Sequence, residues 1–394
     1  MNMKVLVFTS LYPNNVWPNH GVFIKERMTH FARLPGCGVT VVAPVPYYPP
    51  VKFGRRRLFS QVMRKEVKDG IEVYHPRYIM TPGVGMVFYG FLMFLSVLPM
   101  VKRIYREQGF DLIDAHYVYP DGFAAAMLGR ALGIPVVISA RGSDINLYRD
   151  MRVIRWFLSY ALNRARRVIA VCQALKDAMV DLRIAEDKIA VISNGVDTAK
   201  FLPIPRKDAR RELGLPMEKK IVLSVGGLIP RKGFHLLIKA MHLLTRKDER
   251  GNLLLVIAGE GPYRKQLEDL ASSLNVKESV VFTGSIAHQE LYRWYNAADV
   301  FCLASSREGW PNVIMESLAC GTPVVATSVW GTPEIITSDE VGFLVEQNEH
   351  DIAGKITLAL SKAWQRDVIT NHAREHSWNS VAQRVMSVFE AASY

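Results

Sequence analysis

The most restrictive feature of this chain is a repeated alternation of short apolar segments with longer helical ones. In the first half, apolar runs at 4–9, 38–43, 111–116 and 135–139 alternate with helical patterns at 22–34 and 122–132. Strands that are apolar throughout are typical of a parallel sheet whose two faces are covered by crossover helices. The first half therefore predicts an α/β doubly wound domain.

The alternation pauses at a proline-containing stretch, residues 201–205, and then begins again. Apolar runs at 221–225, 253–258, 280–283, 300–303 and 324–327 are separated by helical patterns. A length of 394 residues suits two domains. We expect two doubly wound, Rossmann-like domains, residues 1–193 and 194–375, that face each other across a cleft and bind ligands at the carboxyl ends of their strands. Neither domain shows G-x-G-x-x-G after its first strand, which weakens the case for a nicotinamide dinucleotide.

Charge is distributed unevenly along the chain. Residues 1–200 carry 27 Lys and Arg against 15 Asp and Glu, a net charge of +12, whereas the 22 basic and 22 acidic residues of 201–394 cancel. A basic domain is typical of proteins with anionic partners, such as a membrane surface or a lipid phosphate. A surface that serves only solubility is the alternative. The sequence lacks the motifs of nucleic-acid-binding proteins, so nucleic acid is not an expected partner.

The cysteines and the amino-terminal segment bear on the compartment. The four cysteines have no C-x-x-C spacing, which suits a reducing cytoplasm and argues against a disulfide framework or a zinc site. The apolar run at 5–8 is too short for a signal peptide. We therefore expect a cytoplasmic protein.

Residues 81–101 contain no charged side chain. Their length alone would predict a transmembrane helix. Glycines and Pro99 interrupt the stretch, however, and a doubly wound domain needs a crossover helix at this position. Basic residues at 55–57 and 102–103 flank it. Three interpretations stay open: a spanning helix, a core helix, and a helix that lies on an anionic membrane.

Two loops of the second half carry the chemistry. The first runs from Gly226 to Gly233 and contains Arg231 and Lys232 just before a helical pattern. Glycines permit close approach of the backbone, and the helix start offers free N–H groups, so this loop predicts a pyrophosphate cradle. An ordinary helix start with solvated cations is the alternative.

The second loop, residues 305–311, leads into another helix. Pro311 suits the first helical position, so we expect the N–H groups of Asn312 and Val313 in the first turn to face the cleft. Glu308 lies before the helix, and Glu316 lies more than a turn inside it. Their separation fits two different groups of a ligand, such as a sugar hydroxyl and a ribose, better than one glycosidic bond between two carboxylates.

These motifs together resemble a known family. Glu308 and Glu316, with seven residues between them, match the E-x7-E signature of the retaining glycosyltransferases of family 4, which have the GT-B fold. The loop from Gly227 to Gly233 resembles that family's phosphate loop, and residues 259–262 and 281–286 resemble its nucleoside-facing loops. Residues 376–394 resemble the tail that crosses back onto the first domain. The resemblance covers nearly the whole chain.

The resemblance implies a role for each matching residue. Arg231 and Lys232 would hold the diphosphate, Glu316 the ribose and Glu308 the donor sugar, with the backbone at Ile286 holding the base. Gly21 would close over the phosphate, and His116 would face the donor, although a structural histidine is an equal alternative. The expected donor-binding set is Gly21, Gly227, Arg231, Lys232, Ile286, Glu308, Gly309, Asn312, Val313 and Glu316, and the expected catalytic groups are His116, Arg231, Lys232 and Glu308. Arg141 and Asp144 match positions on the acceptor side.

The implied function is a retaining glycosyltransferase that uses a nucleoside diphosphate sugar. A uridine diphosphate sugar is the first expectation for the donor, and a guanosine diphosphate sugar is the second. Residues 11–13 and 21–24 look most like enzymes of bacterial cell-wall and exopolysaccharide assembly, which suggests a lipid-linked or glycan acceptor at an anionic membrane. No D-x-D pair is placed to bridge the diphosphate, so neither a metal nor another cofactor is expected. The rivals are another GT-B enzyme, such as a nucleotide-sugar epimerase or a phosphorylase, and a non-catalytic nucleotide-sugar-binding protein at the membrane.

Overall fold

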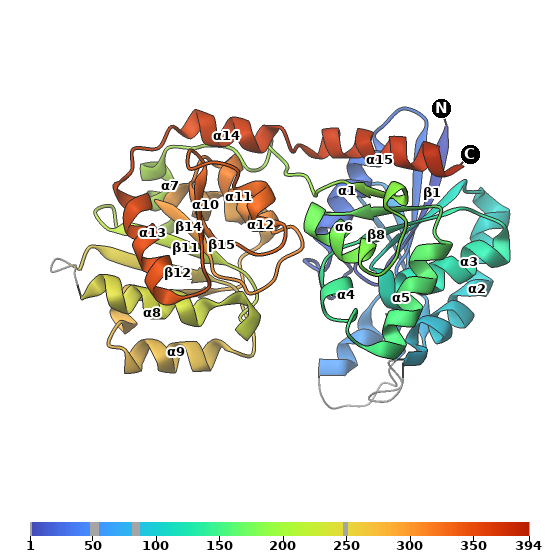
Figure 1. The fold of residues 1–394 in the computed structure, drawn as a ribbon, viewed down its shortest axis with the longest axis horizontal. Coiled ribbons are helices and arrows are strands. Elements are labelled where there is room, and N and C mark those ends of the chain that lie inside the picture. The colour runs from blue at the N-terminus through green and yellow to red at the C-terminus, as the bar shows by residue number, and fades with distance from the viewer. Residues whose placement is uncertain (1, 48–54, 81–86, 247–250, 394) are drawn as a thin grey trace. The chain divides into compact units, whose positions relative to one another are not determined.

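The computed structural model describes residues 2–47, 55–80, 87–246 and 251–393 and divides into two compact units (Figure 1). Unit 1 comprises Met1–Asn194 and Trp378–Tyr394, and unit 2 comprises Gly195–Ser377. Each unit has its own sheet and its own hydrophobic core.

Unit 1 is built on an eight-stranded sheet in the order β10-β9-β8-β7-β1-β2-β5-β4. All neighbouring strands are parallel except the edge hairpin β4–β5. The strand order reverses at β1, which pairs with β2 on one side and with β7 on the other. The strands of unit 1 are β1 (Met3–Phe8), β2 (Cys37–Val42), β3 (Val45–Pro46), β4 (Lys65–Lys68), β5 (Ile71–Tyr74), β6 (Arg77–Tyr78), β7 (Leu112–His116), β8 (Val136–Ala140), β9 (Arg167–Ala170) and β10 (Ile189–Val191).

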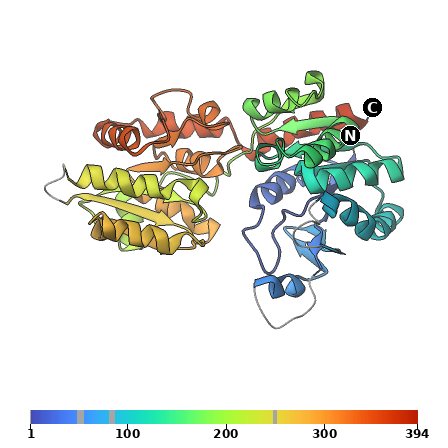
Figure 2. The ribbon, with the colours of Figure 1, turned by 60° about the horizontal axis from the view of Figure 1, so that its bottom comes forward.

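Helices cover both faces of this sheet. On one face, Ile24 and Phe31 of α1 pack with Val385 and Phe389 of α15, which lies among the elements of unit 1 in both views (Figures 1 and 2). On the other face lies α3, which contacts both α2 and α5. The helices of unit 1 are α1 (Val22–Ala32), η1 (Arg55–Gln61), α2 (Tyr89–Gln108), η3 (Val118–Gly122), α3 (Phe123–Leu132), α4 (Ser143–Asn146), α5 (Arg152–Arg164), α6 (Gln173–Val180), η4 (Glu186–Lys188) and α15 (Trp378–Ser393).

Unit 2 is built on a wholly parallel six-stranded sheet in the order β13-β12-β11-β14-β15-β16. Its strand order reverses between β11 and β14. The strands are β11 (Lys220–Val225), β12 (Leu253–Ala258), β13 (Val280–Gly284), β14 (Val300–Leu303), β15 (Val324–Thr327) and β16 (Gly342–Val345).

The apolar sides of α8, α9 and α13 form one core with the strands of unit 2. Helices α10 and α11 contact each other and the same sheet. The helices of unit 2 are α7 (Arg206–Leu213), η5 (Pro230–Lys232), α8 (Phe234–Thr245), α9 (Arg264–Ser273), η6 (Lys277–Ser279), η7 (His288–Glu290), α10 (Leu291–Ala297), α11 (Asn312–Ala319), α12 (Thr332–Ile335), α13 (Glu349–Ser361) and α14 (Arg366–Arg374).

The structure describes residues 87–101 of the uncharged stretch 81–101, whereas 81–86 lie outside the described residues. Val87 and Phe88 precede α2, and residues 89–101 belong to it. One side of α2, including Met93, Val97 and Val101, is buried, whereas Phe91 and Leu95 are exposed. Among the described residues no helix is long and apolar enough to cross a membrane. The crossover helix expected at this position is therefore present.

Candidate active site

The reversal of strand order in unit 2 brings the two predicted loops together. The loop after β11 ends in Arg231 and Lys232, and the loop after β14 carries Glu308. Lys232 Nζ donates to Glu308 Oε1 at 2.6 Å, and Arg231 Nη1 lies 3.7 Å from the same oxygen. Arg231 Nη1 also donates to the carbonyl oxygen of Arg307 at 2.6 Å. Two cations and a carboxylate, predicted from loops about 76 residues apart, thus form one cluster.

The backbone of the first loop requires glycine where it meets the second. Gly233 has φ of +70°, and a Cβ atom there would lie 1.9 Å from the carbonyl oxygen of Ala304. Any other residue would therefore force the two loops apart. Ser306 N donates to the carbonyl oxygen of Arg231 at 2.9 Å, which fixes the loops to each other.

The second loop leads into α11, which begins at Asn312. Pro311 occupies the N-cap position and not the first helical position that we expected. The difference is one residue, and the N–H groups of Asn312 and Val313 still lie in the first turn, where a helix binds anions. Glu308 lies outside the helix and Glu316 inside it, as predicted.

Glu316 is nearly buried, and both of its carboxylate oxygens have partners. Oε1 accepts from His288 Nε2 at 2.8 Å, and Oε2 accepts from Tyr295 Oη at 2.8 Å. His288 Nδ1 lies 2.8 Å from Nζ of Lys200, which can only donate, so Nδ1 accepts while Nε2 faces Glu316. Burial raises the pKa of Tyr295 well above its ordinary value, so its hydroxyl remains a donor.

Sequence reasoning missed His288, Tyr295 and Lys200. His288 lies two residues after Ile286 and begins η7, directly after the loop that was expected to hold the base. A histidine at the end of that loop was the available signal. The contact of Lys200 with His288 joins residues 88 positions apart and has no local signal.

In unit 1, Gly21 precedes α1 and closes the long loop that follows β1. Its φ is +70°, and a Cβ atom there would lie 2.3 Å from the carbonyl oxygen of Leu11. The loop can therefore fold back onto itself only with glycine at this position.

His116 lies at the end of β7, next to the strand reversal at β1, and is fully buried. Burial lowers its pKa to about 4, so the ring is neutral near pH 7. Its Nδ1 accepts from the guanidinium of Arg141, and its Nε2 lies 3.0 Å from Asp114 Oδ2. Arg141 Nη1 also donates to Asn194 Oδ1 at 2.7 Å. The predicted donor-side histidine and the predicted acceptor-side arginine thus contact each other.

Asp144 is completely buried. Its carboxylate accepts from the backbone N–H groups of Val118, Arg141 and Gly142. These bonds hold together the loops that follow β7 and β8. Asp144 therefore positions Arg141 and the start of η3, and its oxygens are turned toward the backbone.

Within the part of the chain that the structure describes, no group of three or more His, Cys, Asp or Glu side chains could hold a metal ion. The cations at the unit 2 site are Arg231 and Lys232, and they come from the chain itself.

Comparison with known proteins agrees with this geometry. Residues 22–200 match the family described as Glycosyltransferase Family 4, and residues 205–376 match Glycosyl transferases group 1. The chain is 30% identical, over 90% of its own length and 88% of the relative's, to a protein of Bacillus subtilis named as the teichuronic acid biosynthesis glycosyltransferase TuaC.

Two solved structures show the same fold over the whole chain. A sucrose-phosphate synthase from Thermosynechococcus elongatus superposes with a TM-score of 0.78 at 20% identity, covering 99% of this chain and 98% of that one. Anabaena HepE in complex with UDP and glucose superposes with a TM-score of 0.75 at 19% identity, covering 99% and 100%. The predicted α/β class and GT-B fold are confirmed. The chain belongs to the group 1 glycosyltransferases, glycosyltransferase family 4.

Proposed function

We propose that this chain transfers a sugar, with retention of anomeric configuration, from a nucleoside diphosphate sugar to a lipid-linked or glycan acceptor in cell-surface polysaccharide assembly. The observation that carries the proposal is the cluster of Arg231, Lys232 and Glu308 at the strand reversal of unit 2. Open α/β sheets bind ligands at such a reversal, beyond the carboxyl ends of the strands.

The cluster suits a leaving diphosphate. Cleavage of the bond between the anomeric carbon and the phosphate places negative charge on the leaving group, and fixed cations beside it stabilise that charge. Lys232 uses one of its three N–H donors on Glu308, so two remain for phosphate oxygens. Glu308 in turn can accept from hydroxyls of the donor sugar.

Glu316 suits the ribose. His288 and Tyr295 fix both carboxylate oxygens, and each oxygen keeps a second lone pair for one of two vicinal hydroxyls. The leaving phosphate would take the proton of the acceptor hydroxyl, so neither glutamate has to attack the sugar. We also propose that the reaction uses no divalent ion, because the chain's own cations can carry the charge stabilisation.

The choice of donor and acceptor rests on the relatives. HepE is a structural neighbour whose complex contains UDP and glucose, which favours a uridine diphosphate sugar. TuaC is named for teichuronic acid biosynthesis, which favours an acceptor of cell-surface polysaccharide assembly.

A transfer assay separates this function from its rivals. The purified chain is incubated with UDP- and GDP-sugars, with and without a membrane lipid extract or simple methyl glycosides, and free nucleoside diphosphate is measured. We expect release that depends on an acceptor, and a product whose anomeric configuration by NMR equals that of the donor. Interconversion of nucleotide sugars without an acceptor would indicate an epimerase, and dependence on inorganic phosphate a phosphorylase. Binding with no turnover under any condition would indicate a non-catalytic protein.

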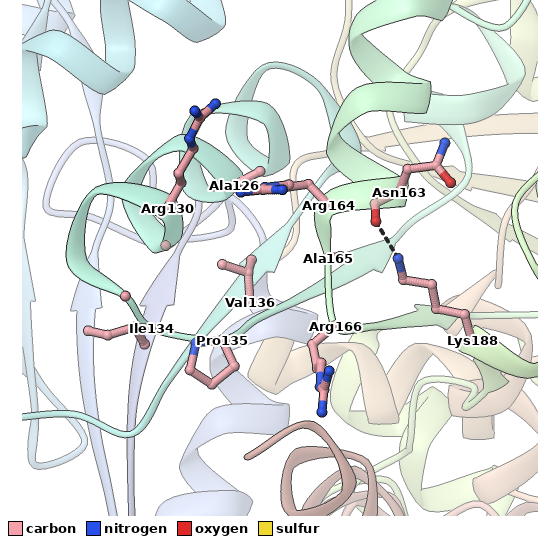
Figure 3. Close-up of a pocket in the computed structure, with 12 residues that line it drawn as sticks. Ala126, Arg130, Ile134, Pro135, Val136, Asn163, Arg164, Ala165, Arg166 and Lys188 are labelled. Atoms are coloured by element: carbon pink, nitrogen blue, oxygen red, sulfur yellow. Dashed lines mark hydrogen bonds between the residues drawn. The ribbon is translucent and has the colours of Figure 1, made fainter. Parts of the chain in front are cut away.

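We further propose that unit 1 associates peripherally with the anionic inner face of the cell membrane. Arg130, Arg164, Arg166 and Lys188 line a hollow of about 530 Å³ between the carboxyl-terminal ends of α3 and α5 (Figure 3). Lys188 caps α5 through the carbonyl oxygen of Asn163 at 2.5 Å, whereas the three arginines have no ion pair within the described ranges.

Helices α2 and α5 of the same layer also expose apolar side chains, in their amino-terminal parts. Phe91 and Leu95 of α2 and Val153 and Trp156 of α5 are exposed. Apolar side chains that enter a bilayer beside a set of cations are typical of peripheral membrane proteins, and each basic residue near an anionic surface contributes ~1 kcal/mol.

Co-sedimentation with liposomes tests the association. We expect binding to anionic but not zwitterionic vesicles, weakened by salt. A triple variant with serine at Arg130, Arg164 and Arg166 should bind the vesicles more weakly than wild type. The control is a triple variant of unit 2 with serine at Lys207, Arg211 and Lys265, which removes the same number of positive charges and should have a smaller effect. Absence of binding at low salt, or equal effects of the two triple variants, would contradict the proposal.

A further inference from the structure

Unit 1 contains a second hollow, of about 470 Å³, beyond the carboxyl ends of β1 and β2. The loop after β1 contributes Ser10, Asn14, Trp17 and His20, while Phe59 of η1 and Tyr78 of β6 form the other side. The volume lies within the range of about 300–1,000 Å³ that is typical of small-ligand sites. Gly21, where the same loop ends, immediately follows His20.

Hydrogen bonds hold in place the segments that carry two of the aromatic rings, Trp17 and Phe59. The rings of Trp17 and Phe59 lie 4.8 Å apart between centroids. Asn15 ties the Trp17 loop to η1, because its Nδ2 donates to the carbonyl oxygen of Gln61 at 3.0 Å and its Oδ1 accepts from Met63 N at 2.9 Å. Asn14 Oδ1 accepts from the N–H groups of Val16 and Trp17. The two rings are therefore fixed before any ligand binds.

The described residues that line the hollow are uncharged, although the hollow lies in the basic half of the chain. Its lining includes no Lys, Arg, Asp or Glu among the described residues. Desolvation lowers the pKa of His20, which keeps the imidazole neutral near pH 7. The described lining therefore holds no opposite charge for a carboxylate, a phosphate or an ammonium group, and burial of an unpaired charge costs free energy.

The floor of the hollow is polar and rigid. Ser10 Oγ donates to Asp121 Oδ2 at 3.1 Å, and Ser10 N donates to Asp121 Oδ1. Asp121 is completely buried, so it holds Ser10 and is not itself exposed to the hollow. Hydroxyl, amide and imidazole groups therefore line the hollow together with the aromatic rings of Trp17, Phe59 and Tyr78.

We propose that this hollow binds an uncharged sugar ring of the acceptor, with the apolar face of the sugar against Trp17 and its hydroxyls toward Ser10, Asn14 and His20. This rests on the proposed glycosyltransferase function. A sugar ring has an apolar face and a polar rim, which matches a lining that combines aromatic rings with hydroxyl, amide and imidazole groups. A lipid tail would leave these polar groups unpaired, and an acidic sugar would find no cation among the described lining residues.

Saturation-transfer NMR with the full chain tests the proposal without knowledge of the natural acceptor. The probes are methyl glycosides of glucose, galactose, mannose and N-acetylglucosamine, with methyl glucuronide as the acidic counterpart and decanol as the apolar one. We expect a signal from at least one neutral glycoside, and little from the glucuronide or decanol. Trp17→Ala should weaken the binding roughly 3- to 10-fold, the range for loss of one aromatic contact, while Trp17→Phe should retain most of it.

The control variant is Tyr105→Ala, an exposed aromatic of α2 in the same unit, which should leave the signal unchanged. Unfolding temperatures of all variants report whether they are folded. No signal from any neutral glycoside, an equal signal in folded Trp17→Ala, or a preference for glucuronide or decanol would overturn the proposal. Thermal shifts with UDP-sugars, measured on the same samples, report donor binding in unit 2, so a failure of the proposed function is recognised separately.

Discussion

The strand reversals of the two sheets carry opposite kinds of polar arrangement. In unit 2, Arg231, Lys232 and Glu308 are half-buried or nearly buried and form direct ion pairs beside a helix start. In unit 1, His116, Arg141 and Asp114 are buried in a network, and the nearby hollow is neutral and aromatic. This difference fits the proposed division of labour, in which unit 2 neutralises a charged group and unit 1 recognises an uncharged one. A nucleoside diphosphate donor and a neutral acceptor sugar have this pair of requirements.

Removal of the unit 2 cations should have the largest effect. Arg231→Ala and Lys232→Ala should each lower kcat by ~10- to 1000-fold, comparable to the loss of one donor that stabilises developing negative charge. Steady-state kinetics with a saturating donor measure this. Lys239→Ala, on the adjacent helix α8, is the matched control because its partner is Glu349, at 3.7 Å. Activity within a factor of about two of wild type in either loop variant would show that the cluster does not contact the diphosphate.

Replacement of His288 should affect KM for the donor more than kcat. His288→Ala removes the bond that fixes Glu316 Oε1, and a hydrogen bond to a charged group is worth about 1.5–3 kcal/mol. We expect KM for the donor to rise about tenfold with a smaller change in kcat, and His288→Gln to recover part of the loss. A fall in kcat at unchanged KM would place His288 in the chemical step instead.

In unit 1, the buried ionisable groups should make the stability of the chain depend on pH. Burial raises the pKa of Asp121 to about 7, so the folded chain holds that proton more tightly than the unfolded chain. Its stabilising contribution is complete below about pH 4 and is lost as pH rises through about 7. The unfolding temperature of wild type relative to Asp121→Asn should therefore fall between pH 4 and pH 8.

His116 should show the opposite sign. Burial lowers its pKa to about 4, so its contribution is lost as pH falls from the ordinary value of about 6.5 toward 4. The unfolding temperature of wild type relative to His116→Asn should therefore rise as the pH is increased from about 4 to about 6.5. Parallel curves for wild type and both variants would contradict the buried network.

The smallest expected effect is that of a chelator. EDTA should leave turnover unchanged, because Arg231 and Lys232 are expected to carry the charge stabilisation that a divalent ion would otherwise supply. The assay is repeated after dialysis against EDTA and after addition of magnesium or manganese. Loss of activity that either ion restores would mean that the donor binds with a metal.

Features that depend on residues close together in the chain, such as apolar periodicity or the residue types of one loop, could be predicted from the sequence. The first strand was expected at 4–9 and is found at Met3–Phe8, and the first helix was expected at 22–34 and is found at Val22–Ala32. The cations and Glu308 were found because each lies in a short loop between a strand and a helix. Such signals depend only on neighbours in the chain.

Features that depend on distant contacts were missed. The short strands β3 to β6, between Val45 and Tyr78, have too few residues for a periodic pattern, and β4 pairs antiparallel at the sheet edge. The contact between His116 and Arg141, and that between Lys200 and His288, join residues 25 and 88 positions apart. Likewise, Trp17 and Phe59 form one wall only because Asn15 ties their loops together.

The most direct test of the central claim is donor binding at the strand reversal of unit 2. The unfolding temperature of the wild-type chain and of Glu316→Gln is measured with a panel of nucleoside diphosphate sugars. A ligand at about 100 times its dissociation constant adds ~2.7 kcal/mol of stability, so we predict a shift of several degrees for wild type with uridine diphosphate sugars and a much smaller one for Glu316→Gln. No shift with any nucleotide sugar, or an equal shift in Glu316→Gln, would contradict the account.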